Sequence, residues 1–317
     1  MSITHYIREI GRGKDGTRSL DAEQARDLMA QVLSGSVSDL ELGAFAIAMR
    51  IKGETVDELA GFLEAAQATC VTIATERPTV VLPSYNGARK LPNLTALLAL
   101  LLSQEGIQVL VHGPLEDGAR VTTAAVFRDL GLPFAADAAD VQAAWARREP
   151  VFMPITALSD ALARLLAVRQ VIGLRNSGHT IAKLLLPCPG PATIRVVNYT
   201  HPDYADLQHR FIGRIGAHAL SMRGTEGEPV ADPRRAPKLD VYLGGTLRPE
   251  LSASAQEGVL TALPLLPRDH DAATTALYIQ SVVSGEKPAP QPLLRQVACL
   301  ASALAAIPVA PISEKSA

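Results

Sequence analysis

The sequence predicts an α/β protein: a small N-terminal helical bundle and a larger domain with a mostly parallel central sheet. The first seventy residues carry three helix-start signals in succession, and beyond about residue 79 short apolar segments alternate with helical ones. Such alternation is typical of a parallel sheet covered by helices on both faces. We expect the bundle in residues 1–70, joined by helices from about 157–186, and the α/β domain in residues 71–317.

The three helix-start signals are capping boxes, in which a residue with a short polar side chain is followed three residues later by Glu or Gln. They begin at Asp21, Ser38 and Thr55. After each box, apolar residues recur at the spacing expected for one buried helix face. Short connections between such helices favour a bundle, and its outer faces are candidates for a contact between two copies.

Beyond residue 70 the sequence predicts strands and helices in turn. The expected strands cover residues 79–82, 107–111, 151–152, 193–197, 217–222 and 239–243. The expected helices cover residues 91–105, 121–131, 138–148, 157–169, 177–186, 202–215, 271–284 and 291–306.

Composition restricts the class of protein. Hydrophobic residues make up 48% of the chain, yet no apolar run is long enough to cross a bilayer, so we expect a globular protein without a membrane partner. Three scattered cysteines, Cys70, Cys188 and Cys299, have neither metal spacing nor a disulfide pattern. This usage fits a reducing compartment, and we expect a cytoplasmic protein.

The charge distribution is more informative than the net charge of −2, which predicts no polyanion partner. Residues 161–202 contain no Asp or Glu but do contain Arg169, Arg175 and Lys183. A locally basic surface is a candidate footprint for an anion or a nucleic acid. The alternative is that these cations are solvated helix residues paired with acids elsewhere, and the sequence leaves both interpretations open.

The turn after the first predicted strand is the main candidate for a ligand site. Ligands of α/β proteins bind at such turns because backbone N–H groups converge there. This turn has one glycine, Gly87, and bulky neighbours that leave little room for a small phosphate. Arg89 and Lys90 follow it at the entry to the helix expected at 91–105, where positive charge opposes the helix dipole. That misfit favours phosphate contact as the role of Arg89 and Lys90. Tyr85 has two possible roles: it either stacks on a base or fills the cleft.

Arg210 and Arg214 lie one helical turn apart in the helix expected at 202–215. Such a basic face can follow a phosphate backbone, although a solvated face is equally common. Aromatic residues make up only 4% of the chain, so a platform for base stacking is poorly supplied. If nucleic acid binds, we expect phosphate contacts to dominate and binding to depend strongly on salt.

Several segments resemble the anthranilate phosphoribosyltransferase and nucleoside phosphorylase superfamily, glycosyltransferase family 3. The segment Ala48-Met49-Arg50-Ile51-Lys52-Gly53-Glu54-Thr55 resembles the end of its N-terminal bundle. Residues 168–175 resemble its Val-Arg-x-x-Leu-Gly-x-Arg helix, and Val111-His112-Gly113 stands where that family has Lys-His-Gly-Asn-Arg. The resemblance covers nearly the whole chain and implies the catalytic-domain fold of that superfamily.

The departures from the family bear on activity. Its diphosphate loop, Gly-Thr-Gly-Gly-Asp-Gly, aligns with Leu82 to Gly87, where Pro83 removes a donor and only the last glycine remains. Its metal-binding Asp-Glu pair falls at about Pro229-Val230, which cannot bind Mg²⁺. Transfer of a phosphoribosyl group needs the metal and aligned donors, so these losses argue against it. The degenerate ligand loop comprises Pro83, Ser84, Tyr85, Asn86, Gly87, His112 and Gly113.

Within the superfamily the chain is similar to the YbiB-type paralogues, a branch of nucleic-acid-binding homodimers. Residues 175–183 and 223–228 carry this similarity, which implies a homodimer formed through the helical domain. In the family, Arg169 and Arg175 match positions that bind anionic substrates, Lys183 replaces a polar site residue and Arg223 replaces a histidine. The candidate phosphate-binding residues are therefore Arg89, Lys90, Arg169, Arg175, Lys183, Arg210, Arg214 and Arg223.

Three hypotheses follow. The first is a non-enzymatic homodimer that binds DNA, and possibly RNA, with little sequence preference and without a catalytic residue, metal or cofactor. The second is an active pentosyltransferase, either a phosphoribosyltransferase or a nucleoside phosphorylase, with an altered site that uses Mg²⁺ and phosphoribosyl diphosphate. The third is a protein-interaction scaffold that uses the bundle face.

Overall fold

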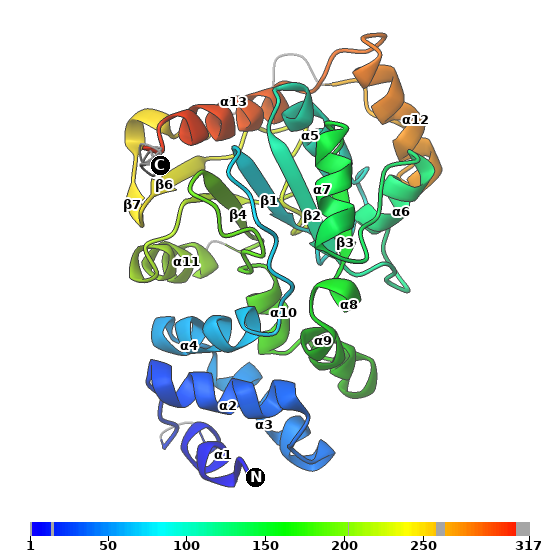
Figure 1. Ribbon diagram of the computed structural model, residues 1–317. Coiled ribbons are helices and arrows are strands. Elements are labelled where there is room, and N and C mark those ends of the chain that lie inside the picture. Colours follow the sequence, from blue (N-terminus) through cyan, green and yellow to red (C-terminus); the bar gives the residue numbers. More distant parts are fainter. Residues whose placement is uncertain (1, 14–15, 202, 258–263, 309–317) are drawn as a thin grey trace, which may run out of the picture.

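The computed structural model describes residues 2–13, 16–201, 203–257 and 264–308. It has the two parts that the sequence predicts, a helical bundle at the N-terminus and a larger α/β domain (Figure 1). Among the helices described, none is both long and apolar enough to cross a bilayer.

The bundle begins with four helices: α1 (Thr4–Ile10), α2 (Ala22–Ser34), α3 (Asp39–Lys52) and α4 (Val56–Gln67). All three predicted capping boxes are present, at the starts of α2, α3 and α4. In the third box, Glu58 is buried and also links other parts of the bundle. It accepts hydrogen bonds from the Leu20 backbone N–H at 2.9 Å and from Lys52 Nζ at 2.6 Å. No capping signal marks α1, which lacks a side-chain cap.

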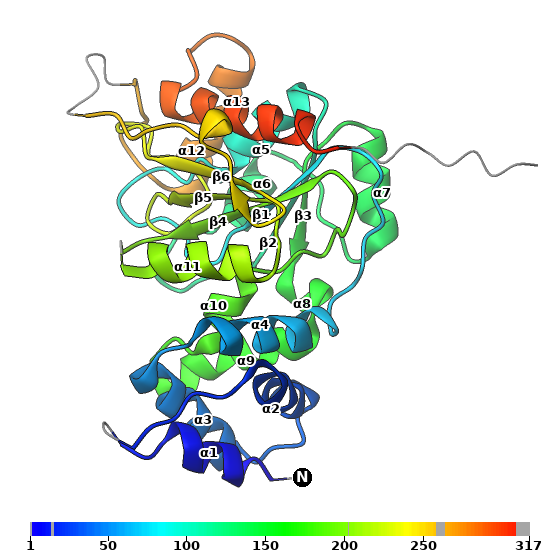
Figure 2. The same cartoon turned by 90° about the vertical axis from the view of Figure 1, so that its left-hand side faces the viewer.

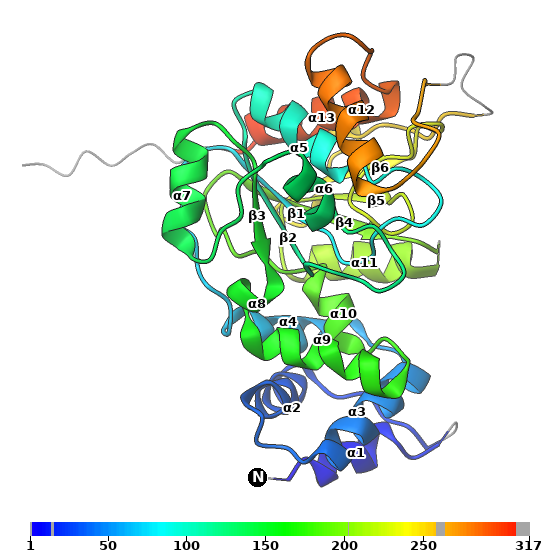
Figure 3. The same ribbon diagram turned by 90° about the vertical axis from the view of Figure 1, so that its right-hand side faces the viewer.

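Two later helices, α9 (Asp160–Ile172) and α10 (Ser177–Ala182), pack against these four. They follow the short helix α8 (Ile155–Leu158), which contacts α9. Helix α9 contacts α2, and α10 contacts α3 and α4 (Figure 3). The bundle is therefore built from two stretches of chain, and α10 lies between it and the sheet (Figure 1).

The sheet has seven strands in the order β3-β2-β1-β4-β5-β6-β7. Their bounds are β1 (Thr79–Pro83), β2 (Gln108–Gly113), β3 (Val151–Pro154), β4 (Thr193–Tyr199), β5 (Ala219–Arg223), β6 (Leu239–Leu243) and β7 (Thr246–Leu247). The first five are parallel, β6 is antiparallel to β5, and β7 is antiparallel to β6. Strand β7 was not predicted from the sequence; the hairpin turn that precedes it is Gly244-Gly245. Both glycines have positive φ, 57° and 78°, as a two-residue hairpin requires.

Helices cover both faces of the sheet. One face carries α5 (Thr95–Gln104), α6 (Thr123–Asp129), α12 (Ala272–Val283) and α13 (Gln291–Ala305), and the other carries α7 (Ala138–Ala146) and α11 (Asp203–Arg214) (Figure 2). Each face has its own hydrophobic core. Val80 and Leu82 of β1 pack into the first core, under α5, α6, α12 and α13, whereas Val81 packs into the second core, under α7 and α11. The second core continues into the bundle, so the two parts share a hydrophobic interior.

The order of strands brings several loops together. Strand β1 has β2 on one side and β4 on the other, so the chain reverses its direction of travel across the sheet at β1. Ligand sites of open α/β sheets lie at such a reversal, beyond the carboxyl ends of the strands. The loops after β1, β2, β4 and β5 all leave from this edge.

Candidate anion-binding site

The loop after β1 holds a carboxylate of the chain itself. Glu228, from the turn after β5, is 1% exposed. Its Oε1 accepts hydrogen bonds from the backbone N–H groups of Asn86 and Gly87, both at 2.8 Å. Its Oε2 accepts from the hydroxyls of Ser84 and Thr123. The loop therefore does bind an anion, but that anion is intramolecular.

A second carboxylate of the same turn binds the next part of the loop. Glu226 Oε2 accepts from the backbone N–H groups of Arg89 and Lys90, each at 3.0 Å, and of Leu91 at 3.2 Å. Burial raises the pKa of Glu226, but these three hydrogen bonds and the charge of Arg120 together outweigh it and leave the pKa below its usual value. From sequence, Glu226 and Glu228 were candidates only to replace the family's metal-binding pair, in the wrong register, and neither was predicted to bind the loop.

Close backbone approach fixes this turn, which we call the plug turn (residues 224–228). A Cβ on Gly227 would lie 1.7 Å from Asn86 Nδ2, and the φ of Gly227 is 90°. The Gly227 carbonyl accepts from Lys183 Nζ at 3.2 Å and from Asn198 Nδ2 at 2.5 Å. The plug turn is therefore held by donors from α10 and β4 as well as by the loop.

Cations gather behind the loop. Arg175 Nη1 donates to Asn86 Oδ1 at 2.6 Å, and Arg120 Nη1 donates to the Gly87 carbonyl at 3.3 Å. Burial lowers the pKa of Arg175, and the charges of Arg169 and Arg120 lower it further. The structure thus brings two of the predicted arginines, Arg169 and Arg175, close together. It adds Arg120, which lies outside the acid-free stretch and was therefore missed.

Lys183 and Arg169 differ in their partners: Lys183 donates to the Gly227 carbonyl, whereas Arg169 is paired with an acid. Burial lowers the pKa of Lys183 to about 8, with Glu228 opposing the shift and Arg175 adding to it. Arg169 forms an ion pair with Asp117, with Nη1 and Oδ2 at 3.2 Å. Arg169 is therefore the acid-paired member of this cluster.

Arg89 and Lys90 are exposed, and neither forms an ion pair with an acid in the described part of the chain. Helix α5 begins at Thr95 and not at residue 91, and the Thr95 N–H donates to the Asn93 side chain at 3.3 Å. Both cations therefore precede the first turn of the helix, and the predicted misfit between their charge and the helix dipole is wrong. Their exposure leaves both side chains accessible to a phosphate.

Of the remaining predicted cations, two are paired with acids and one lies beside the plug turn. Arg210 pairs with Asp206 at 3.0 Å, and Arg214 of α11 pairs with Asp57 of α4 at 3.2 Å. Arg223 is exposed at the end of β5, next to the plug turn. The acid-free stretch does not form one basic surface, because Arg195 is buried in β4 and donates to the Leu184 carbonyl.

Tyr85 fills the interior of the loop. It is 5% exposed, and its hydroxyl lies 2.8 Å from His112 Nδ1. A buried ring cannot stack on a base, so the cleft-filling interpretation is the one that the geometry matches. Burial lowers the pKa of His112 to about 3, which keeps it neutral. Gly113 permits the close contact of the two strand ends, since a Cβ there would lie 1.9 Å from the Ser84 carbonyl oxygen.

A polar cavity of about 260 Å³ lies between the bundle and the α/β domain. Arg50 and Glu54 line it from the bundle side, and the Ser177 hydroxyl donates to Glu54 at 2.6 Å. His179 also lines it; burial and the charges of Arg175 and Arg169 lower its pKa to about 3. The cavity therefore brings arginine and lysine side chains together with Glu54 and a neutral histidine.

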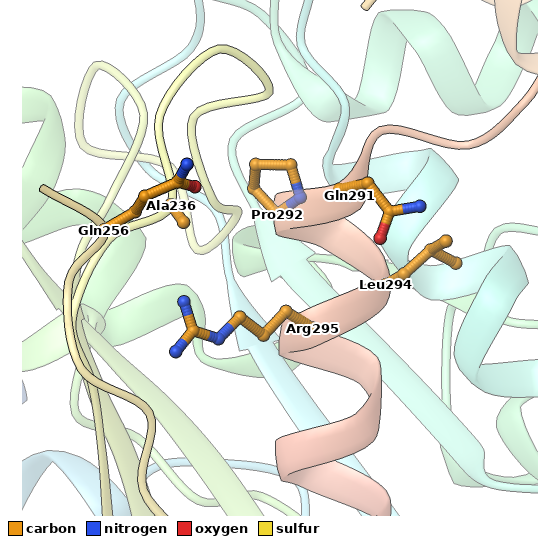
Figure 4. A pocket seen from close by; sticks show the side chains of 6 residues that line it. All are labelled: Ala236, Gln256, Gln291, Pro292, Leu294 and Arg295. Atoms are coloured by element: carbon orange, nitrogen blue, oxygen red, sulfur yellow. The ribbon is translucent and has the colours of Figure 1, made fainter. Parts of the chain in front are cut away.

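A second hollow, of about 430 Å³, lies where α13 begins, on the side of the α/β domain away from the bundle (Figures 1 and 4). Arg295 extends from α13 toward the segment of Gln256, whereas Leu294 lies on the other side of the helix (Figure 4). Of its lining residues within the described chain, Arg295 alone is charged. This hollow is separate from the loop and holds no recognisable reactive group.

The residues at the loop do not fit a divalent cation. Mg²⁺ needs oxygen ligands, but each Glu228 oxygen already accepts from N–H or hydroxyl donors. Within the described residues no three His, Cys, Asp or Glu side chains come close enough to hold a metal ion. We therefore assign no step of any reaction to a metal at this position.

Sequence comparisons relate the chain to known proteins. Residues 4–70 match the family model described as glycosyl transferase family, helical bundle domain. The uncharacterized protein YbiB of Escherichia coli is 41% identical over 302 residues, which cover 94% of this chain and 93% of YbiB. The anthranilate phosphoribosyltransferase of Methanopyrus kandleri is 25% identical over 302 residues, covering 94% and 88% of the two chains.

Solved structures show the same fold. The anthranilate phosphoribosyltransferase of Thermus thermophilus matches with a TM-score of 0.70 at 18% identity, covering 94% of this chain and 92% of the other. The Saccharomyces cerevisiae enzyme, in complex with PRPP and Mg, matches with a TM-score of 0.62 at 12% identity, covering 95% and 94%. Both likenesses concern the arrangement of the bundle and the sheet.

Proposed function

This chain belongs to the anthranilate phosphoribosyltransferase (glycosyltransferase family 3) superfamily, in the family of YbiB, and from that membership we propose that it has kept the fold but not the transfer reaction. We propose instead that the protein is cytoplasmic and binds nucleic acid, DNA and possibly RNA, through its phosphates and with little sequence preference.

One observation carries the proposal: Glu228 occupies the amides of the loop after β1. A diphosphate placed on the Asn86 and Gly87 amides would meet a buried carboxylate already bound there. Like charges at such short range repel strongly in a poorly solvated site. The loop that would hold the diphosphate of a phosphoribosyl donor is thus closed by the chain itself, which argues against transferase activity.

Phosphate binding is proposed for the rim of this loop. Arg89 and Lys90 are exposed and unpaired within the described chain, with Arg223 exposed at the other side of the plug turn. Flexible exposed cations bind phosphate oxygens without reading base edges. Tyr85 is buried, so it supplies no stacking surface, and this supports sequence-tolerant binding.

We propose a homodimer formed through the helical domain. Helices α1 and α3 lie together at the free end of the bundle (Figure 3). They border a groove of about 1150 Å³, in which the α3 side chains Leu40 and Ile51 are 85% and 81% exposed. Two such side chains on one helix face are typical of a surface covered by a partner, and a second copy would bury both apolar faces at once.

A salt titration tests the binding proposal. We expect a fluorescently labelled single-stranded DNA, and an RNA of the same sequence, to show increased anisotropy with the protein at low salt. The logarithm of the binding constant should fall linearly with the logarithm of salt concentration. Absence of binding at low salt, or binding that does not respond to salt, would refute the proposal.

The alternative, an active phosphoribosyltransferase or phosphorylase with an altered site, has one observation in its favour. The polar cavity between bundle and sheet carries Arg50, Arg175 and Lys183, which suit a small anion. Thermal unfolding distinguishes the two, since a ligand that binds only the folded state raises the Tm. We expect phosphoribosyl diphosphate with Mg²⁺ to raise the Tm no more than the same concentration of pyrophosphate does; a larger, concentration-dependent rise would favour the enzyme.

A further inference from the structure

The two carboxylates of the plug turn are held in different ways. Glu228 is buried, and both of its oxygens accept from side-chain or backbone donors deep in the loop. Glu226 is only partly buried, and its hydrogen bonds come from backbone N–H groups at the protein surface. Glu228 is therefore a structural anion, whereas Glu226 can leave its site without opening the core.

The amides that hold Glu226 form an anion site of their own. The backbone N–H groups of Arg89, Lys90 and Leu91 all point at one oxygen, at 3.0, 3.0 and 3.2 Å. Three consecutive amides directed at one point form a concave anion-binding nest. The side chains of Arg89 and Lys90 project from the same residues into solvent, unpaired within the described chain. Amides and side chains together are better suited to a doubly charged phosphate than to one carboxylate.

The backbone of Glu226 also favours release. Its φ is 52°, in the left-handed region that side chains other than glycine rarely adopt. The hydrogen bonds to the Arg89, Lys90 and Leu91 amides are among the contacts that hold it there. A ligand that takes over these amides would allow Glu226 to relax into solvent.

We propose that the amides of residues 89–91, with the side chains of Arg89 and Lys90, form a phosphate subsite that Glu226 occupies in the absence of ligand. Glu226 then acts as an internal competitor and weakens phosphate binding by the fraction of molecules in which it is bound. The inference rests on the proposed function only for the source of the phosphate, a nucleic-acid backbone.

Two variants remove the competitor in different ways. Glu226→Gln removes the charge and keeps the side-chain shape, and Glu226→Gly removes the side chain at a position whose φ suits glycine. Glu250→Gln is the matched control, since Glu250 is an exposed acid paired with Arg248 on another turn. It makes the same change in net charge without touching the subsite.

The first probe is inorganic phosphate, followed by amide chemical shifts in NMR spectra of the full chain. We expect shifts centred on Arg89, Lys90 and Leu91. If Glu226 fills the subsite in nine-tenths of molecules, Glu226→Gly should bind about tenfold more tightly than wild type. Glu226→Gln keeps a neutral amide oxygen that competes more weakly than a carboxylate, so it should bind more tightly than wild type and less tightly than Glu226→Gly. Glu250→Gln should match wild type. Equal affinities for all four proteins, or shifts centred elsewhere, would overturn the inference.

The second probe is a labelled single-stranded oligonucleotide, which separates this inference from the proposed function. Tighter phosphate binding by the Glu226 variants without oligonucleotide binding by any protein would support the subsite and reject the nucleic-acid function. Oligonucleotide binding that is the same in wild type and both Glu226 variants would support the function and reject the subsite. Tighter binding of both probes by the Glu226 variants alone would support both.

Discussion

The Glu228 carboxylate accepts a 2.8 Å hydrogen bond from the Gly87 amide, 141 residues earlier in the chain. This contact joins the turn after β5 to the loop after β1, across the intervening strand β4. It fills with a side chain the kind of amide nest that proteins otherwise use for phosphate. This part of the sheet edge therefore binds a side chain of the protein itself instead of a ligand.

Replacement of Glu228 should destabilise the protein. Glu228→Gln exchanges an oxygen that accepts hydrogen bonds for an NH₂ group that faces other donors, and so leaves buried donors unsatisfied. We expect a loss of about 2–3 kcal/mol in the free energy of unfolding, measured by urea denaturation. Glu250→Gln, on the surface, should change it by less than about 0.5 kcal/mol. Equal stabilities of the two variants would contradict the assigned role.

Gly227 offers a test of the close approach between plug turn and loop. A Cβ at this position would overlap Asn86 Nδ2, 1.7 Å away, on backbone with a φ of 90°. Gly227→Ala should therefore cost about 2 kcal/mol or more in unfolding free energy. The control is Gly131→Ala, where φ is 69° and nothing lies within 4 Å, so only the backbone strain of about 1 kcal/mol applies.

Lys183 should give stability a dependence on alkaline pH. Its pKa is about 8 in the folded protein, against an ordinary value of 10.5, because burial disfavours the charge. Between these two pH values the unfolded chain binds more protons at this residue, so Lys183 by itself makes stability rise with pH across this window. The buried thiols of Cys70 and Cys188, whose pKa burial raises, act in the opposite sense in the same range. Lys183→Met should remove this contribution, which we expect to be about 3 kcal/mol, and so make the change of stability with pH less favourable than in wild type, in urea denaturation at several pH values. Lys238→Met, at an exposed ion pair, should keep the wild-type slope.

The sequence allowed most of the fold to be predicted because its signals are local. The capping boxes at Asp21, Ser38 and Thr55 act within one helical turn, and the buried strands are short runs of apolar residues that can be recognised without knowledge of distant contacts. Strand β7 was missed because it is two residues long and depends on a Gly-Gly turn. The start of α5 was misplaced because apolar residues precede the first hydrogen-bonded turn.

The candidate site was harder to predict because it depends on contacts between distant segments. The anion character of the loop after β1 could be inferred from its position after a strand. That Glu228 would fill it could not, since 141 residues separate Glu228 from the Gly87 amide that it binds. Charge pattern alone did not distinguish free from paired cations: Arg89 is unpaired within the described chain, whereas Arg214 is tied to Asp57 of another helix.

The apolar face of α3 predicts the effect of charge on assembly. Ile51→Asp places a carboxylate on the groove between α1 and α3, where the proposed second copy would bury it without a partner. We expect the variant to be monomeric in light scattering coupled to size-exclusion chromatography, and wild type to be dimeric. Leu277→Asp, at an exposed leucine of α12, should remain dimeric. A monomeric wild type would refute the dimer, and dissociation of both variants would refute this choice of face.

Arg89 and Lys90 allow the phosphate contacts to be tested separately from the fold. Both side chains are exposed and unpaired in the described chain, so the double variant Arg89→Ala/Lys90→Ala should keep the stability of the wild type. Each lost phosphate contact should reduce the slope of log binding constant against log salt by about 1, so the double variant should lose about 2. The control is Arg210→Ala/Arg214→Ala, which removes the same charge from arginines paired with Asp206 and Asp57. Because those arginines are already neutralised by acids, we expect the control to change the slope less. Equal slopes for the two double variants would mean that general charge, and not the rim of the loop, accounts for binding.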